Sequence, residues 1–178
     1  MLSRDELIIL LESGKFEEFN KAVAGCEQDE VDLSEVDFSN MTLTNVNFTN
    51  ATLNSAGFSD AHLSEVDFTN CDLTSADFTR STCVECNFSE ALLNGTDFSY
   101  SKLDYCNFTE TDLAGAILNE ADLSNSDFSC SYNLSACRFD EETIWPDSDL
   151  LPEGFDAIYS DDLSSLKDDD DYTQDSDY

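Results

Sequence analysis

The stretch VDLSEVDFSNMTLTNVNFTNATLNSAGFSD (residues 31–60) places a Leu or a Phe at every fifth position. A helix repeats every 3.6 residues and a strand every two, so a period of five fits neither element. A fixed period of this kind instead favours a repeat architecture. The pattern continues without a gap from Leu33 to Phe128. We call the Leu or Phe of each pentapeptide its centre.

Each pentapeptide has two apolar positions, the centre and the residue two before it. Residues two apart in an extended segment share a face, so both can enter one interior while the other three face water. If the chain turns a corner after each pentapeptide, four of them close a square coil of twenty residues. Such coils stack through backbone ladders about 4.8 Å apart and bury a continuous core. We therefore expect an all-β solenoid of five to six coils over residues 31–144.

The centres alternate between Leu and Phe, with Cys83 and Leu118 as the two exceptions. Centres twenty residues apart should stack, which gives two opposite Phe faces and two opposite Leu faces. One column would hold Phe38, Phe58, Phe78 and Phe98, and the other Phe48, Phe68, Phe88, Phe108 and Phe128. Stacked rings add about 0.5–1.5 kcal/mol per pair to the free energy of burial.

Individual repeats, such as ADFTR (76–80), CDLTS (71–75), TDLAG (111–115) and ADLSN (121–125), carry a family resemblance. They resemble the A-(D/N)-(L/F)-X-X signature of pentapeptide-repeat proteins. The resemblance implies a right-handed quadrilateral β-helix over residues 31–144.

Residues 1–26 are expected to form an α-helical cap on the first coil. Ser3 and Glu6 have the spacing of a capping box, and Gly14 would end the first helix. A second short helix is expected over KFEEFNKAVA (15–24), with Gly25 as its stop. This arrangement is similar to that of cyanobacterial pentapeptide-repeat proteins with helical N-terminal caps.

After Phe128 the register slips by one residue, which places an insertion near Cys130 or Ser131. The last three centres are then predicted to be Leu134, Phe139 and Ile144. Trp145 should cover the final coil, and Pro146 should stop further pairing. We expect residues 145–160 to form a C-terminal capping segment and residues 161–178 a disordered acidic tail.

Forty acidic and seven basic residues give a net charge of −33 and a pI near 4.1. This charge disfavours direct binding to nucleic acid or to anionic membranes and favours a protein partner with a basic surface. The apolar stretch LIILL (7–11) is too short for a signal or transmembrane segment. We expect a cytoplasmic monomer. Its seven cysteines, an odd number without a disulfide spacing, should be reduced.

Chemistry is not indicated by the side chains. His62 is the single histidine, and no triad, second metal-binding histidine or glycine-rich phosphate loop accompanies it. We therefore expect no enzyme activity, no catalytic residues, no cofactor and no metal. Cys83, Cys86 and Cys106 fall on inward positions, which favours buried structural thiols; a redox-sensing role is the alternative.

Five residues interrupt the polar pattern of the outward positions and form a candidate partner patch: Leu92, Tyr100, Tyr105, Ala114 and Ile117. The first hypothesis for function is a non-enzymatic protein-interaction or scaffold module that presents a rigid acidic rod. The alternative comes from the family resemblance. Quinolone-resistance pentapeptide proteins mimic duplex DNA and bind DNA gyrase, so a DNA mimic acting on gyrase or topoisomerase is the second hypothesis.

Overall fold

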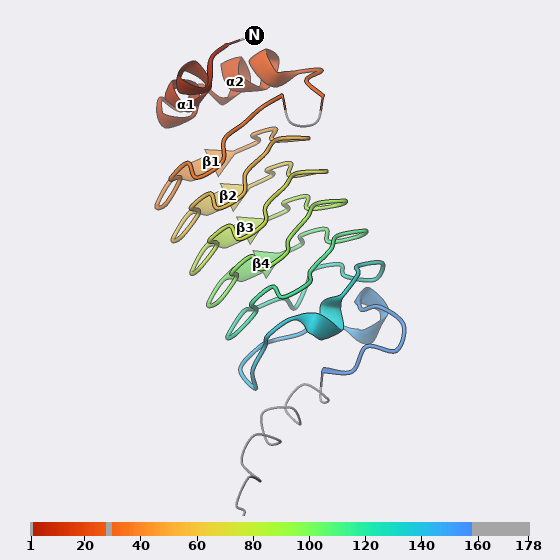
Figure 1. The fold of residues 1–178 in the computed structure, drawn as a ribbon. Coiled ribbons are helices and arrows are strands. Elements are labelled where there is room, and N and C mark those ends of the chain that lie inside the picture. The colour runs from red at the N-terminus through yellow and green to blue at the C-terminus, as the bar shows by residue number, and fades with distance from the viewer. Residues whose placement is uncertain (1, 28–29, 158–178) are drawn as a thin grey trace, which may run out of the picture.

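The chain forms one column with a helical cap at its N-terminal end (Figure 1). The computed structural model describes residues 2–27 and 30–157. Helices α1 (Arg4–Glu12) and α2 (Phe16–Val23) lie across the top of the column, and the chain then winds through stacked coils. This is the β-solenoid with a helical cap that the repeat predicts. The predicted acidic tail, 161–178, and the end of the predicted capping segment, 158–160, lie outside the described residues.

The coils stack with an offset of twenty residues. On one side they form a parallel sheet in the order β1-β2-β3-β4, in which Leu43 pairs with Leu63 and Leu63 with Cys83. Its strands are β1 (Thr42–Thr44), β2 (His62–Ser64), β3 (Thr82–Val84) and β4 (Lys102–Asp104). The other sides are joined by isolated parallel bridges with the same offset, such as Asp37 to Gly57 and Asp67 to Asn87.

We number the four sides in chain order, so that face 3 carries β1–β4. The first coil supplies the first centre of each face, namely Leu33 (face 1), Phe38 (face 2), Leu43 (face 3) and Phe48 (face 4). Coil 4, used below, comprises residues 91–110.

The core is built on two facing columns of Phe rings. Within a column, rings twenty residues apart lie 4.5–5.4 Å from centroid to centroid and within 25° of parallel. Across the interior, Phe58 on face 2 meets Phe68 on face 4 edge to face, at 5.6 Å and 86°. The nine Phe centres of the two columns are at most 1% exposed. The predicted stacking of Phe48 on Phe68 is therefore confirmed, at 5.4 Å.

Each corner of the square uses a left-handed backbone conformation. Every fifth residue from Glu35 to Glu120, the last of its pentapeptide, has a φ of 54–72°. This conformation costs most non-glycine residues about 1–2 kcal/mol. Within this series Gly95 and Gly115 avoid the cost, and the Asn and Asp corners tolerate the conformation better than other side chains do.

The Asp or Asn before each centre supports the backbone that leads into the corner. Its carboxylate or amide oxygen accepts a hydrogen bond from the backbone N–H two residues later, at 2.8–3.2 Å in twelve repeats. Asp37 does so with Ser39, and Asn47 with Thr49. Many of the acidic residues of the repeat are therefore structural as well as charged.

The cap covers the backbone edge of the first coil. Asn20 of α2 donates from Nδ2 to the carbonyl of Asn45 and accepts from the N–H of Asn47, at 2.8 and 2.9 Å. Phe19 packs edge to face on Phe48 at 5.5 Å. The predicted Ser3–Glu6 capping box is present. An edge that would otherwise recruit another strand is thus paired and covered.

The predicted position of the register slip was wrong. Tyr132 still pairs with Asp112, twenty residues earlier, so the offset of twenty is kept at Tyr132, after Cys130 and Ser131. The extra residue is Asn133, which has a left-handed φ of 58° and precedes the buried Leu134 at the start of a 3₁₀ turn, η1 (Leu134–Ala136).

A second extra residue enters before the final centre. Arg138 pairs with Ile117 at an offset of 21, and Ile144 pairs with Asp122 at an offset of 22. The prediction of Ile144 as the last buried centre was therefore also wrong, since Ile144 is 53% exposed. A shift by one residue moves a side chain to the opposite face.

Trp145 takes the inward position instead of Ile144. Its ring packs against Phe139 at 4.9 Å and Phe155 at 5.0 Å, and the second 3₁₀ turn, η2 (Ser148–Leu150), follows. Leu150 accepts a hydrogen bond from the N–H of Phe128 at 2.7 Å, so the C-terminal edge is also partly paired.

The aromatic core predicts a large effect of truncation. Phe68 contacts rings above, below and across the interior, so Phe68→Ala should lower the free energy of unfolding by about 3–5 kcal/mol. Phe68→Leu should cost less, about 1–2 kcal/mol, because Leu118 already occupies a Phe column. Urea denaturation followed by circular dichroism measures both. Equal effects of the two substitutions would contradict ring stacking as the source of stability.

The corner hydrogen bonds predict a pH dependence. The Ser39 hydroxyl, and after it the Ser39 N–H, lower the pKa of Asp37. Its contribution is therefore complete above the unfolded-state pKa of about 3.9 and is lost as the pH falls through the lower folded-state pKa. At pH 7, Asp37→Ala should lower the free energy of unfolding by about 0.5–1.5 kcal/mol. Asp37→Asn should cost less, since Asn47 makes the same bond.

Urea denaturation at neutral pH and at about pH 3 tests this expectation. The difference between the wild type and Asp37→Ala should shrink at the acidic pH. A difference of the same size at both pH values would show that the carboxylate charge is not involved.

Candidate functional site

The five residues of the predicted partner patch differ in exposure. Leu92, Tyr100 and Tyr105 are 44%, 57% and 65% exposed. Ala114 and Ile117 are half-buried. The first three are therefore the members that can offer most side-chain surface to a partner.

The register distributes these residues around the column. Leu92 and Ala114 lie on face 1, where Leu92 pairs with Asp112. Ile117 lies on face 2, between Asp97 and Arg138. Tyr100 occupies the corner between faces 2 and 3, and Tyr105 the corner between faces 3 and 4.

The structure brings Tyr100 and Tyr105 to the two edges of one face and separates them from Leu92 and Ala114 on the opposite side. Between the tyrosines lies strand β4, whose outward residue Lys102 is exposed. We call Tyr100, Lys102 and Tyr105 the coil-4 surface. Sequence reasoning missed Lys102, although it is the one Lys between residues 31 and 144.

Both tyrosines adopt a conformation that suits them poorly. Their φ angles are 61° and 55°, in the left-handed region where Asn, Asp and Gly are favoured and bulky residues are outliers. Their neighbours in the same corner columns are Arg80 and Glu120 for Tyr100, and Glu85 for Tyr105. Exposed, strained side chains that add nothing to the core point to a role at the surface.

The corner column through Tyr100 is rich in charge. Arg80 binds Asp60 through two hydrogen bonds of 2.9 Å. On the other side, the charge of Glu120 and a hydrogen bond to it raise the pKa of Tyr100. The ion pairs within the described residues involve Lys15, Lys21 and Arg80. Lys102 is therefore available to a partner.

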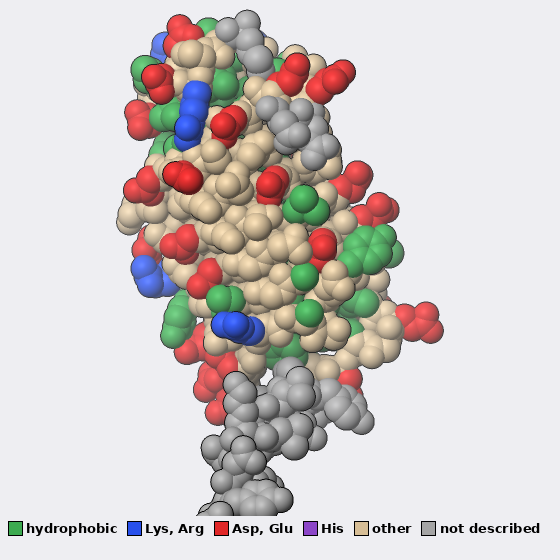
Figure 2. Space-filling view, in the orientation of Figure 1, with side chains coloured by type: hydrophobic (Ala, Val, Ile, Leu, Met, Phe, Trp, Pro, Cys, Tyr) green, Lys and Arg blue, Asp and Glu red, His purple; other side chains and the backbone are tan. Residues whose placement is uncertain are grey.

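The surrounding surface is acidic. Residues 31–144 contain 20 acidic and three basic side chains, a net charge of −17. On the side shown in Figure 2, acidic side chains outnumber basic ones and occur along the whole column, with uncharged polar groups between them. Such a charge distribution gives the column a negative electrostatic potential.

Cys83, Cys86 and Cys106 are free thiols in mutual contact inside the column, and each is at most 2% exposed. Burial raises the pKa of Cys83, whereas hydrogen bonds with the thiols of Cys106 and Cys83 lower the pKa of Cys86. An oxidant must reach a thiol to react with it, so exposure rather than ionisation controls their reactivity. Their environment favours a packing role.

Sites for other chemistry are not evident. Within residues 2–27 and 30–157, no three His, Cys, Asp or Glu side chains are grouped in a way that could hold a metal ion. Across the same part of the chain, the helices are all too short or too polar to span a bilayer.

Several solved structures are similar to this chain. A pentapeptide repeat protein from Nostoc PCC 7120 is 27% identical, covers 58% of this chain and 80% of its own, and has a TM-score of 0.44. A pentapeptide repeat protein from the Arabidopsis thaliana thylakoid lumen is 27% identical, covers 57% and 68%, and has a TM-score of 0.37. The plasmid-mediated fluoroquinolone resistance protein QnrB1 is 19% identical, covers 65% and 74%, and has a TM-score of 0.37. No curated protein matches the chain.

Family models match most of the coiled part of the chain. The model described as "Pentapeptide repeat region" matches residues 22–98, and that described as "Pentapeptide repeats (8 copies)" matches residues 106–141. Together they cover the stacked coils except residues 99–105, and they leave out most of the helical cap and the C-terminal segment. The chain therefore belongs to the pentapeptide repeat family.

Proposed function

We propose that this protein is a non-enzymatic, cytoplasmic interaction module that binds a protein partner at the coil-4 surface. The observation that carries the proposal is the pair of exposed tyrosines, Tyr100 and Tyr105, held in left-handed corners on either side of Lys102. Aromatic side chains are enriched among the residues that dominate binding energy at protein interfaces.

The column supports this role by its rigidity. Each coil is hydrogen-bonded to its neighbours, so the coil-4 surface is ordered before the partner arrives. A preorganised surface loses less conformational entropy on binding than a flexible one. Because the column around it is acidic, the partner should present basic residues around the groups that contact the tyrosines. The face 1 members of the patch, Leu92 and Ala114, would form a separate contact.

The charge density favours a second candidate, mimicry of duplex DNA. A net charge of −17 over residues 31–144 amounts to about three charges per twenty-residue coil. At about 4.8 Å per coil, this is one charge per roughly 1.6 Å of column, close to the value of about 1.7 Å for duplex DNA. A protein that binds DNA, such as gyrase or topoisomerase, would then be the partner.

Affinity capture from the source cell tests the first proposal. A basic protein should be retained by the wild type and lost with the double variant Tyr100→Ala, Tyr105→Ala, because both aromatic contacts are removed. Tyr132→Ala is the control, since Tyr132 is 56% exposed but lies on face 1. Equal loss with the control, or no loss with either variant, would refute the coil-4 surface. Inhibition of gyrase supercoiling that survives the double variant would favour DNA mimicry.

The strained corners predict opposite effects on stability and binding. Tyr105→Gly should raise the free energy of unfolding by about 0.5–1 kcal/mol: it relieves about 1–2 kcal/mol of left-handed strain and costs about 0.4–1 kcal/mol of unfolded-state entropy. It should also weaken partner binding. Glu110→Gly, at a φ of 59° on another corner, is the control and should stabilise without weakening binding. Thermal unfolding and the same capture assay provide both readouts.

A further inference from the structure

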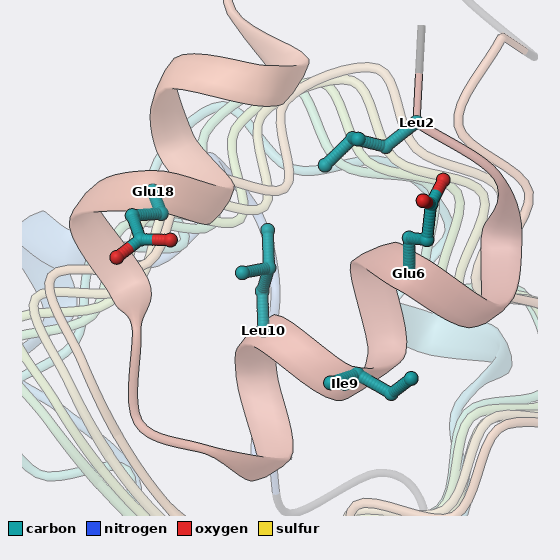
Figure 3. Close-up of a pocket in the computed structure, with 5 residues that line it drawn as sticks. All are labelled: Leu2, Glu6, Ile9, Leu10 and Glu18. Atoms are coloured by element: carbon teal, nitrogen blue, oxygen red, sulfur yellow. The ribbon is translucent and has the colours of Figure 1, made fainter.

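We propose that the outer side of the helical cap binds a basic amphipathic helix of a partner protein. A pocket of about 420 Å³ lies there, lined by Leu2, Glu6, Ile9, Leu10 and Glu18 (Figure 3). The pocket belongs to the cap and not to the coils, so this proposal does not depend on the coil-4 surface. We call these five residues the cap pocket.

Two of the three apolar residues of the cap pocket, Leu2 and Ile9, are not explained by the packing of the cap on the column, whereas Leu10 is partly buried against the core. Helix α1 already buries Leu7 and Leu11 against the core, at 3% and 1% exposure. Ile9, in contrast, is 57% exposed and Leu2 is 39% exposed. A β-branched residue at an exposed helical position contributes neither high helix propensity nor burial. Its side chain gains free energy only if something covers it.

The rim of the cap pocket is negative. Glu6 from α1 and Glu18 from α2 stand on opposite sides of it, with Leu2 and Leu10 between them (Figure 3). A hydrogen bond from the Ser3 N–H lowers the pKa of Glu6, so this carboxyl is charged at neutral pH. Glu18 meets Lys15 at 3.6 Å in a solvent-exposed pair, which is worth at most about 1 kcal/mol. A cationic side chain of a partner can therefore displace Lys15 from Glu18.

The other cations of the two helices are engaged elsewhere. Lys21 lies 3.8 Å from Glu17, and Arg4 donates to the carbonyl of Ser34 on the column. An apolar floor between two carboxylates matches a helix that has apolar residues on one side and Lys or Arg beside them. The volume lies within the range of about 300–1,000 Å³ typical of binding pockets.

Electrostatic repulsion argues against three other possible occupants of the cap pocket. A second copy of the chain brings a net charge of −33 to the contact, and an anionic membrane is repelled in the same way. The chain's own segment 161–178 contains eight Asp and one Lys, so it is also repelled by Glu6 and Glu18. A cationic helix from another protein is the occupant that both the apolar floor and the acidic rim favour.

Two peptides of equal length and charge separate this site from general attraction to an acidic protein. One is a Leu/Lys peptide that forms an amphipathic helix, and the other replaces its Leu residues with Ser. Fluorescence anisotropy of the labelled peptides, titrated with the full-length protein at about 0.15 M salt, gives their affinities. The Leu/Lys peptide should bind more tightly by roughly 10- to 100-fold, because only it has apolar residues to cover Ile9 and its neighbours.

Ile9→Asp is the decisive variant. It makes the protein more acidic, so general attraction predicts tighter binding of both peptides, whereas the cap pocket predicts a loss of roughly 10- to 100-fold for the Leu/Lys peptide alone. Tyr132→Asp makes the same charge change on an exposed side chain of face 1 and should leave that affinity intact. Circular dichroism confirms that both variants are folded.

Four results would overturn the proposal. Equal affinity for the two peptides, or equal effects of Ile9→Asp and Tyr132→Asp, would show that peptide binding depends only on the overall charge of the protein. Sedimentation that reveals an Ile9-dependent dimer would assign the cap pocket to a second copy of the chain. Ile9-dependent binding to phosphatidylserine vesicles would assign it to a membrane.

Discussion

Parallel pairing between residues twenty apart is the constraint on which the rest of this structure depends. It places each Phe centre on another, at ring distances of 4.5–5.4 Å within a column. It also places Phe58 against Phe68 across the interior, so two aromatic columns interlock along the axis. Core packing, backbone pairing and the surface columns follow from the same offset.

The square cross-section of the column requires particular backbone conformations, and the side chains support these conformations in different ways. Each corner needs a left-handed residue, and each approach to a corner is held by an Asp or Asn that accepts a backbone hydrogen bond. Part of the large negative charge is therefore a consequence of the fold. Tyr100 and Tyr105 stand out because they are the aromatic residues in this series of left-handed corners and both are more than half exposed. Our proposal that they contact a partner would give these exposed rings a role.

Each end of the column has a backbone edge and core side chains that need to be covered, and different residues cover them at the two ends. At the N-terminal end, Asn20 forms hydrogen bonds with the free backbone edge, and Phe19 covers Phe48, the first ring of the face 4 column. At the C-terminal end, Trp145, Phe139 and Phe155 close the core. The two helices also have an outer side that faces away from the coils, and there the exposed Ile9 and the two glutamates line the cap pocket.

The sequence by itself determined the period of five, the coil of twenty, the two Phe columns and the Ser3–Glu6 capping box. These features depend on local sequence patterns. Because the offset between paired residues is constant, the pattern of one coil is repeated in the next. The same counting also identified Tyr100 and Tyr105 as outward residues.

Only the tertiary structure decided how the chain packs where extra residues interrupt the twenty-residue offset. One extra residue is accommodated at Asn133 and another between Arg138 and Ile144, so Trp145 and not Ile144 packs against the core. At the last coil no further repeat lies beyond to hold the register, and the packing of the largest ring against its aromatic neighbours sets the choice. The surface sites were hidden for a related reason. The exposure of Lys102 beside the two tyrosines, and the pocket that Ile9 shares with Glu6 of α1 and Glu18 of α2, depend on how strands and helices are arranged in space.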